Sequence, residues 1–162
     1  MSRPIPVITA LTLLGSSLSA QSAPPVAQGL PGAWRVIEVT TTGPGASTDT
    51  TPEPGLYIFT EKHFSFTRVT GDTPRTTVGD AYATVSQLRD ILRFAAQAGT
   101  YEVVGNDLVL RRVAALSAPN MLPGNTATYG FRLAGDTLWL TTKAAQSGPL
   151  SNPLIVKLVR VE

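Results

Sequence analysis

The chain has 162 residues, of which 43% are hydrophobic and only 15% are charged, so it can bury one domain-sized core. The net charge of +2 is not gathered into a basic cluster, which excludes the surface typical of nucleic-acid binding. Cysteine is absent and there is a single histidine, which excludes disulfides, thiol nucleophiles and Cys- or His-rich metal sites. We therefore expect no metal and no cofactor.

The first 20 residues have the pattern of a signal peptide. Arg3 supplies a short positive segment, residues 7–14 are apolar, and small residues follow as far as Ala20. The apolar run is too short to span a bilayer, which needs about 20 residues. We expect an exported protein, periplasmic or extracellular, without a membrane span. Residues 21–31 then form a flexible Pro-rich linker, and residues 32–162 form the folded domain.

Most of this domain reads as short strands separated by turns. Apolar alternation and β-branched or aromatic residues predict about eight strands, near residues 34–41, 55–60, 63–69, 100–104, 107–115, 126–133, 137–142 and 154–161. Gly105-Asn106 is a favoured hairpin turn. Residues 43–54, rich in Gly, Pro, Ser and Thr, are expected to form a loop.

One segment, residues 80–99, predicts an α-helix after the third strand. Val85, Leu88 and Leu92 follow a spacing of three to four residues. Asp80 is a suitable N-cap, and Gly99 stands where a helix commonly ends. The expected fold is therefore mainly β: an antiparallel up-and-down barrel of about eight strands with one inserted helix. A barrel of this size either fills with side chains or holds one small ligand.

Four phrases, in this order, carry a resemblance: "GAWRVIEV", "PGLYIFTEKHFSF", "GTYEVVGNDLVLRRV" and "YGFRLAGDTLWLT". The chain resembles bacterial lipocalin-like domain proteins, which are distant relatives of the lipocalin and calycin barrels. The resemblance implies that Trp34 lies inside the closed end of the barrel and that Arg160 packs over it. Residues 134–136 lack the Thr-Asp-Tyr turn of lipocalins, and the helix is not near the C-terminus. Both departures favour a lipocalin-like relative over a true lipocalin.

The candidate ligand-binding residues follow from strand alternation, which places aromatic and basic side chains on single strand faces. They are Tyr57, Phe59, Phe66, Arg68, Tyr101, Arg112 and Phe131. The rings either line a hollow interior or fill a solid core. The arginines either lie at strand ends within reach of solvent or anchor the carboxylate of an otherwise apolar ligand. Glu38 shares the face of Trp34 and Val36 by the same alternation.

Catalytic motifs are weak in this sequence. No Gly-x-Ser-x-Gly elbow or phosphate-binding loop is present, and His63 falls beside a polar turn. The first hypothesis is that the barrel binds or carries a small hydrophobic molecule, as a monomer or weak dimer. A packed structural or stress-related envelope protein without ligand is the second. An isomerase, cyclase or hydrolase that uses Glu38, His63 or a tyrosine is the third, so the chain is more plausibly not an enzyme.

Overall fold

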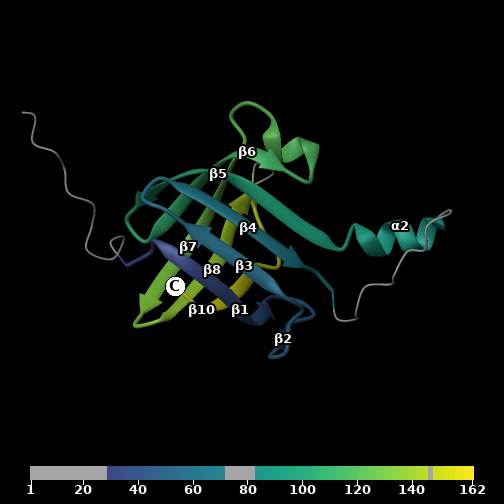
Figure 1. Ribbon diagram of the computed structural model, residues 1–162, viewed down its shortest axis with the longest axis horizontal. Coiled ribbons are helices and arrows are strands. Elements are labelled where there is room, and N and C mark those ends of the chain that lie inside the picture. The colour runs from purple at the N-terminus through teal and green to yellow at the C-terminus, as the bar shows by residue number, and fades with distance from the viewer. Residues whose placement is uncertain (1–28, 72–82, 146–147) are drawn as a thin grey trace, which may run out of the picture.

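The computed structural model describes residues 29–71, 83–145 and 148–162 (Figure 1). The helical segments are α2 (Val85–Ile91) and the short 3-10 helix η1 (Ala118–Met121). The strands are β1 (Gly32–Thr41), β2 (Ser47–Asp49), β3 (Gly55–Phe59), β4 (His63–Val69), β5 (Phe94–Val104), β6 (Asp107–Ala115), β7 (Thr126–Ala134), β8 (Thr137–Ala145), β9 (Gly148–Pro149) and β10 (Leu154–Arg160). The predicted signal peptide and all of the predicted linker before Gly29 lie outside the described residues.

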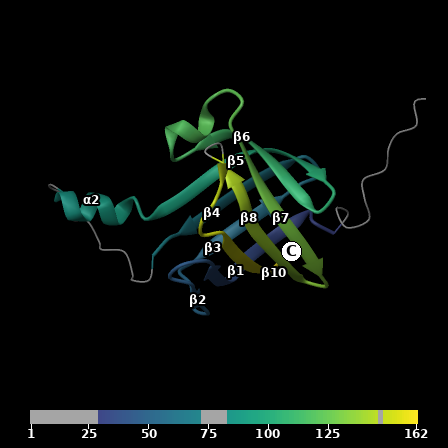
Figure 2. The same cartoon turned by 180° about the vertical axis from the view of Figure 1, so that it is seen from behind.

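Eight strands form a closed antiparallel barrel in the order β1-β3-β4-β5-β6-β7-β8-β10, and β10 pairs with both β8 and β1 (Figures 1 and 2). Closure leaves no long unpaired sheet edge in this ring. The two short strands are additions, since β2 pairs with β1 and β9 pairs with β8. The prediction of a mainly β, eight-stranded antiparallel barrel is confirmed.

The predicted position of the helix is wrong, because α2 lies after β4 and not after the third strand. The difference arises at residues 47–49, which were expected to be loop and instead pair with β1. Helix α2 is also shorter than predicted. Thr84 caps it through a reciprocal pair of hydrogen bonds with Gln87, and it ends at Ile91. The expected N-cap, Asp80, lies outside the described residues.

Residues 94–99 form part of β5, although they were predicted to be helical. The alanines of this stretch favour a helix locally. Pairing with β4 on one side and β6 on the other supplies ladder hydrogen bonds that override this preference. The remaining helix projects away from the barrel (Figures 1 and 2). Its apolar residues Val85, Leu88 and Leu92 are exposed.

One end of the barrel, here called the plug end, is sealed. Leu30, Trp34, Leu138 and Leu158 are completely buried there. The indole Nε1 of Trp34 donates to the carbonyl oxygen of Leu30 at 2.9 Å. The Arg160 guanidinium lies over the Trp34 ring, 4.1 Å from its centroid, which is a cation–π geometry.

Arg160 also ties the residues before β1 to the barrel. Its Nη1 donates to the carbonyl oxygen of Pro31 at 2.8 Å, and its Nη2 donates to that of Gly29. The side chain therefore satisfies backbone acceptors at the same point where it covers the indole.

A β-bulge in β1 changes which residues face inward. The pairing with β10 shifts between Val36 and Glu38, so that Val39 joins the inward-facing set beside Val156. Glu38 is directed to the outer surface, where its Oε2 lies 3.8 Å from Lys157 Nζ. The expectation that Glu38 shares the face of Trp34 and Val36 is wrong, because simple alternation holds only without a bulge.

Candidate ligand-binding site

The predicted aromatic residues lie on the inner wall and pack against one another. The Tyr57 ring stacks on Phe66 with centroids 4.6 Å apart, and Phe59 meets Tyr101 edge to face at 5.6 Å. These four side chains and Phe131 are buried. Side chains therefore fill the middle of the barrel at these positions, and room for a ligand must be sought elsewhere along its axis.

The end opposite the plug, here called the Arg68 end, is less tightly covered. Inward-facing Val39, Ala95 and Leu154 are only half-buried there, although they pack against the core. At the plug end the corresponding large side chains have no exposed surface. The barrel is thus closed at one end and partly accessible at the other.

Polar side chains gather on the inner face of the Arg68 end. Arg112, in line with buried Leu108 and Leu110 on β6, donates from Nε to Gln97 Oε1 at 2.7 Å and from Nη1 to Asn125 Oδ1 at 3.0 Å. Sequence reasoning found Arg112 but missed Gln97, which lay in the predicted helix, and Asn125, which lay in a loop.

Arg68 lies on the inner face of β4, after Phe64 and Phe66. Its stem passes over Gly55, where an added Cβ would come 2.9 Å from Arg68 Cγ and 2.7 Å from Val36 Cγ2. Its Nε is buried and has no hydrogen-bond partner within the described structure. A buried donor without an acceptor lowers the stability of the fold, because the hydrogen bonds that it lost to water on burial are not replaced.

Two tyrosine hydroxyls share this environment. Burial raises the pKa of Tyr57 and of Tyr129 above the ordinary tyrosine value. Arg68 acts on both hydroxyls and Arg112 on that of Tyr129, and these positive charges partly offset the rise. The two arginines therefore act at one and the same hydroxyl, that of Tyr129.

We predict that Tyr57→Phe makes the protein less sensitive to alkali. Folded Tyr57 keeps its proton above pH 10, whereas the unfolded chain releases it, so rising pH favours unfolding from about pH 10 upward. Above that pH the free energy of unfolding of the wild type falls more steeply than that of Tyr57→Phe, by ~1.4 kcal/mol per pH unit. Urea unfolding between pH 7 and pH 11.5 measures both curves. Parallel curves above pH 10 would contradict the prediction.

The charged pairs of the barrel strands lie on its outer surface and at the plug end. They are Glu38–Lys157, Glu102–Arg111, Asp107–Lys143 and Asp136–Arg160. Over residues 29–71, 83–145 and 148–162, no ion pair includes Arg68 or Arg112. Among the described residues, the inner face of the Arg68 end thus carries two positive charges, Arg68 and Arg112, that have no acidic partner.

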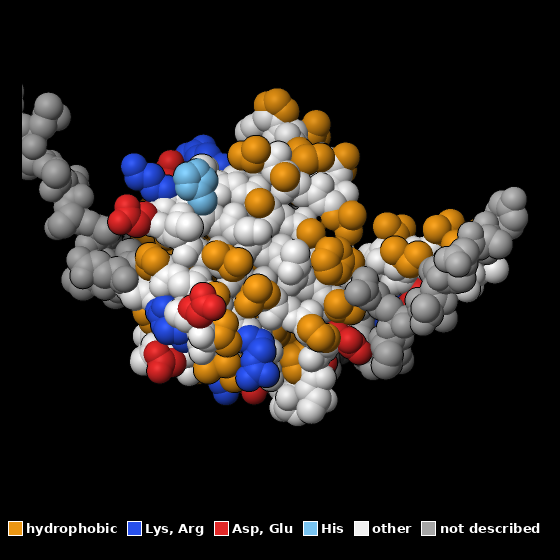
Figure 3. All heavy atoms as spheres, in the orientation of Figure 1, with side chains coloured by type: hydrophobic (Ala, Val, Ile, Leu, Met, Phe, Trp, Pro, Cys, Tyr) orange, Lys and Arg blue, Asp and Glu red, His pale blue; other side chains and the backbone are white. Residues whose placement is uncertain are grey.

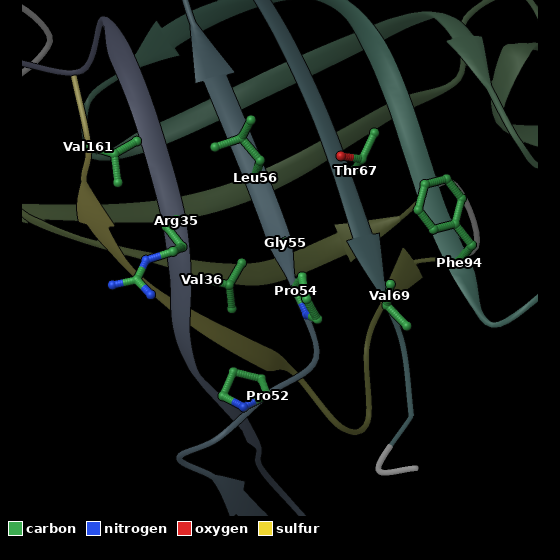
Figure 4. Close-up of a pocket in the computed structure, with 10 residues that line it drawn as sticks. All are labelled: Arg35, Val36, Pro52, Pro54, Gly55, Leu56, Thr67, Val69, Phe94 and Val161. Carbon is green, nitrogen blue, oxygen red and sulfur yellow. The ribbon is translucent and has the colours of Figure 1, made fainter. Parts of the chain in front are cut away.

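A cavity of about 600 Å³ lies on the other side of the same wall (Figure 4). It follows the outer face of β1, β3 and β4, and its lining is mostly apolar. Leu56, Val69 and Phe94 contribute, and Gly55 and Val36 also line it (Figure 4). Hydrophobic side chains are visible across this side of the molecule in Figure 3. We call this surface the outer groove.

The residues that an enzyme could use are divided between the two surfaces. His63 is exposed at the start of β4 and lines a small hollow at its turn. Glu38 also lies outside the barrel. Of the groups named for catalysis, Tyr57 and Tyr129 face the inner polar cluster.

Comparisons with known proteins do not assign a function to this chain. No family model and no curated protein matches this sequence. Among solved structures, the chain is similar to a lipocalin-like protein from Bacteroides uniformis, with 13% identity and a TM-score of 0.44 over 81% of this chain and 97% of that one. The closed eight-stranded antiparallel barrel described above agrees with the barrel fold that the resemblance implied. No helix among the described residues is long and apolar enough to cross a membrane.

Proposed function

We propose that this barrel binds a small, largely hydrophobic molecule at its Arg68 end. The observation that carries the proposal is the difference between the two ends. The plug end is sealed by Trp34 and Arg160, whereas apolar inner-wall residues at the Arg68 end keep part of their surface exposed. Burial of such surface by an apolar ligand is favourable, at about 25 cal/mol per Å².

The packed middle of the barrel limits how deep a ligand reaches. Tyr57 and Phe66 are paired neighbours on β3 and β4, and their stacked rings on the inner wall form the floor of the proposed site. The bound molecule therefore lies against these rings and between Val39, Ala95 and Leu154. The other predicted residues, Phe59, Tyr101 and Phe131, lie beyond this floor and act on the ligand only through packing.

The same packed middle favours a second candidate, a structural barrel that binds nothing. In that case the half-buried residues Val39, Ala95 and Leu154 are the edge of a solid core, at the point where its packing ends. The two candidates differ in one measurable property, which is saturable binding of an apolar molecule at the Arg68 end.

Binding can be tested with Nile red, a neutral apolar dye whose fluorescence rises in an apolar site. We expect saturable 1:1 binding in the micromolar range. Ala95→Trp, on the inner face beside Arg68, should weaken it about tenfold or more, ~1.4 kcal/mol, by filling the site. Ala96→Trp is the matched control. Ala96 pairs with the exposed residue Thr67 on β4, and it lines a hollow on the outside of the barrel. This variant should leave binding within about twofold of wild type.

Three results would contradict the proposal or its placement. Absence of saturable binding favours the structural barrel. An equal loss of Nile red affinity in Ala95→Trp and Ala96→Trp would show that the dye does not bind on the inner face. A loss in Leu56→Asp with none in Ala95→Trp places the dye in the outer groove.

We also propose that the protein acts outside the cytoplasm. The support is the sequence pattern of residues 1–20, with Arg3, the apolar run and the small residues up to Ala20. Mass spectrometry of the intact protein from its own source measures the N-terminus. A mature chain that begins near residue 21 is expected, and one that keeps residues 1–20 in a cytoplasmic fraction would contradict this location.

A further inference from the structure

We propose that the molecule bound at the Arg68 end carries a carboxylate, which Arg68 and Arg112 hold. This inference rests on the proposed binding function and names the chemical class of its ligand. It is carried by two inward-facing guanidinium groups at the same end of the barrel. Arg68 pairs with Ala95 on β5, and Arg112 donates to Gln97, two residues further along the same face of that strand. In the described part of the chain neither has an acidic ion-pair partner.

Both groups stay charged wherever they are placed. Arginine keeps its proton at every physiological pH, so it cannot escape the cost of burial by becoming neutral. Desolvation of a positive charge is unfavourable unless an opposite charge or several hydrogen bonds compensate it. The buried Nε of Arg68 finds no acceptor among the described residues, and an anion placed beside it would supply one.

The neighbours of Arg112 position it without neutralising it. Gln97 and Asn125 offer amide oxygens, which are neutral acceptors. Asn125 is itself held, because its Nδ2 donates to the carbonyl oxygen of Pro119 at 2.7 Å. The guanidinium is therefore fixed before any ligand arrives, which lowers the entropic cost of binding.

The surroundings select the rest of the ligand. A planar guanidinium presents paired N–H donors that match the two oxygens of a carboxylate. Beside this polar cluster, the same end of the barrel also has apolar inner-wall residues, which are Val39, Ala95 and Leu154. A carboxylate on an apolar body therefore fits this end better than a neutral apolar molecule.

Arg68→Met tests this against a purely structural role for the arginine. If Arg68 stabilised the fold, the variant would be less stable. If its charge serves a ligand, the unliganded variant keeps or gains thermal stability, because an unpaired cation is replaced by an apolar side chain of similar length. The matched control is Arg132→Met, whose arginine lies on the outer surface, 3.4 Å from the centroid of the Trp139 ring.

The ligand pair for the test is dodecanoate and 1-dodecanol, which share an apolar chain and differ in charge. Both are titrated at pH 7.5, below micelle formation, by displacement of Nile red. We expect wild type and Arg132→Met to bind dodecanoate at least tenfold more tightly than dodecanol. Arg68→Met and Arg112→Met should bind the two equally, mostly through loss of dodecanoate affinity.

Each outcome separates this inference from the function on which it rests. If wild type binds both ligands tightly and without preference, the inference of a carboxylate ligand is wrong, while the hydrophobic site stands. Failure of both to bind wild type overturns the site itself. If wild type prefers dodecyl phosphate over dodecanoate by tenfold, the inference of a carboxylate is wrong and the ligand's anionic group is a phosphate. Should an arginine variant not fold, the acid-to-alcohol ratio of the wild type still decides the question.

Discussion

Trp34→Ala should lower the free energy of unfolding by about 3–5 kcal/mol, which is the range for deletion of a buried aromatic side chain. The indole has no exposed surface and donates to the Leu30 carbonyl oxygen. Its removal leaves a cavity in the buried cluster that includes Leu138 and Leu158, and takes away the ring under Arg160. Urea unfolding followed by circular dichroism measures the loss.

The second tryptophan provides the matched control. Trp139 is half-buried on the outer face, with the Arg132 guanidinium against its ring. Trp139→Ala removes an exposed cation–π contact, worth about 0.5–1 kcal/mol, and some packing surface. We expect a loss below about 2 kcal/mol. Equal losses for the two variants would show that Trp34 does not seal the plug end.

Gly99→Ala should cost about 3 kcal/mol, at the upper end of the usual range for an overpacked site. Gly99 lies at the irregular step between β5 and β6, and a Cβ there would come 2.0 Å from the Arg111 carbonyl oxygen. Backbone cannot rotate aside as a side chain can, so the two strands must separate locally. Thermal and urea unfolding report the change.

Gly130→Ala is the comparison for this substitution. Its added Cβ would meet Lys143 Cε at 2.7 Å, which is near the end of a flexible side chain. The lysine can move, so we expect a change within about 1 kcal/mol, part of it offset by the lower entropy of the unfolded chain. If Gly130→Ala lowered the free energy of unfolding more than Gly99→Ala, the close backbone contact at Gly99 would not determine the cost of adding a Cβ.

Much of the inner wall could be predicted from alternation alone. Strands β3 and β4 have regular pairing, so Tyr57, Phe66 and Arg68 face the interior as a period of two requires. Arg112 continues the alternation of Leu108 and Leu110, because the irregularity between β6 and β5 comes after it. The hairpin turns also followed from their residues, since Gly105 has a positive φ of 62°. Where strands pair regularly, the alternation of the sequence shows directly which side chains face the inside of the barrel and which face the outside.

The rest depended on contacts between distant segments. The helical signal of residues 94–99 is real in isolation, but β4 and β6 recruit these residues into a sheet. The bulge after Val36 is not marked by a glycine, so the outward turn of Glu38 has no local signal. Gln97 and Asn125 could join the candidate site only once these long-range pairings were known.

The pairing of β1 with β10 has a consequence for how the protein folds. Trp34 lies opposite Arg160, so the contact that completes the ring joins residues separated by most of the chain. Contacts of such long sequence separation slow folding, because the intervening chain must be ordered first. During synthesis the earlier strands must wait, with their apolar faces uncovered, until β10 emerges. Closure of the ring by β10, with Arg160 over Trp34, is therefore the expected last step of folding.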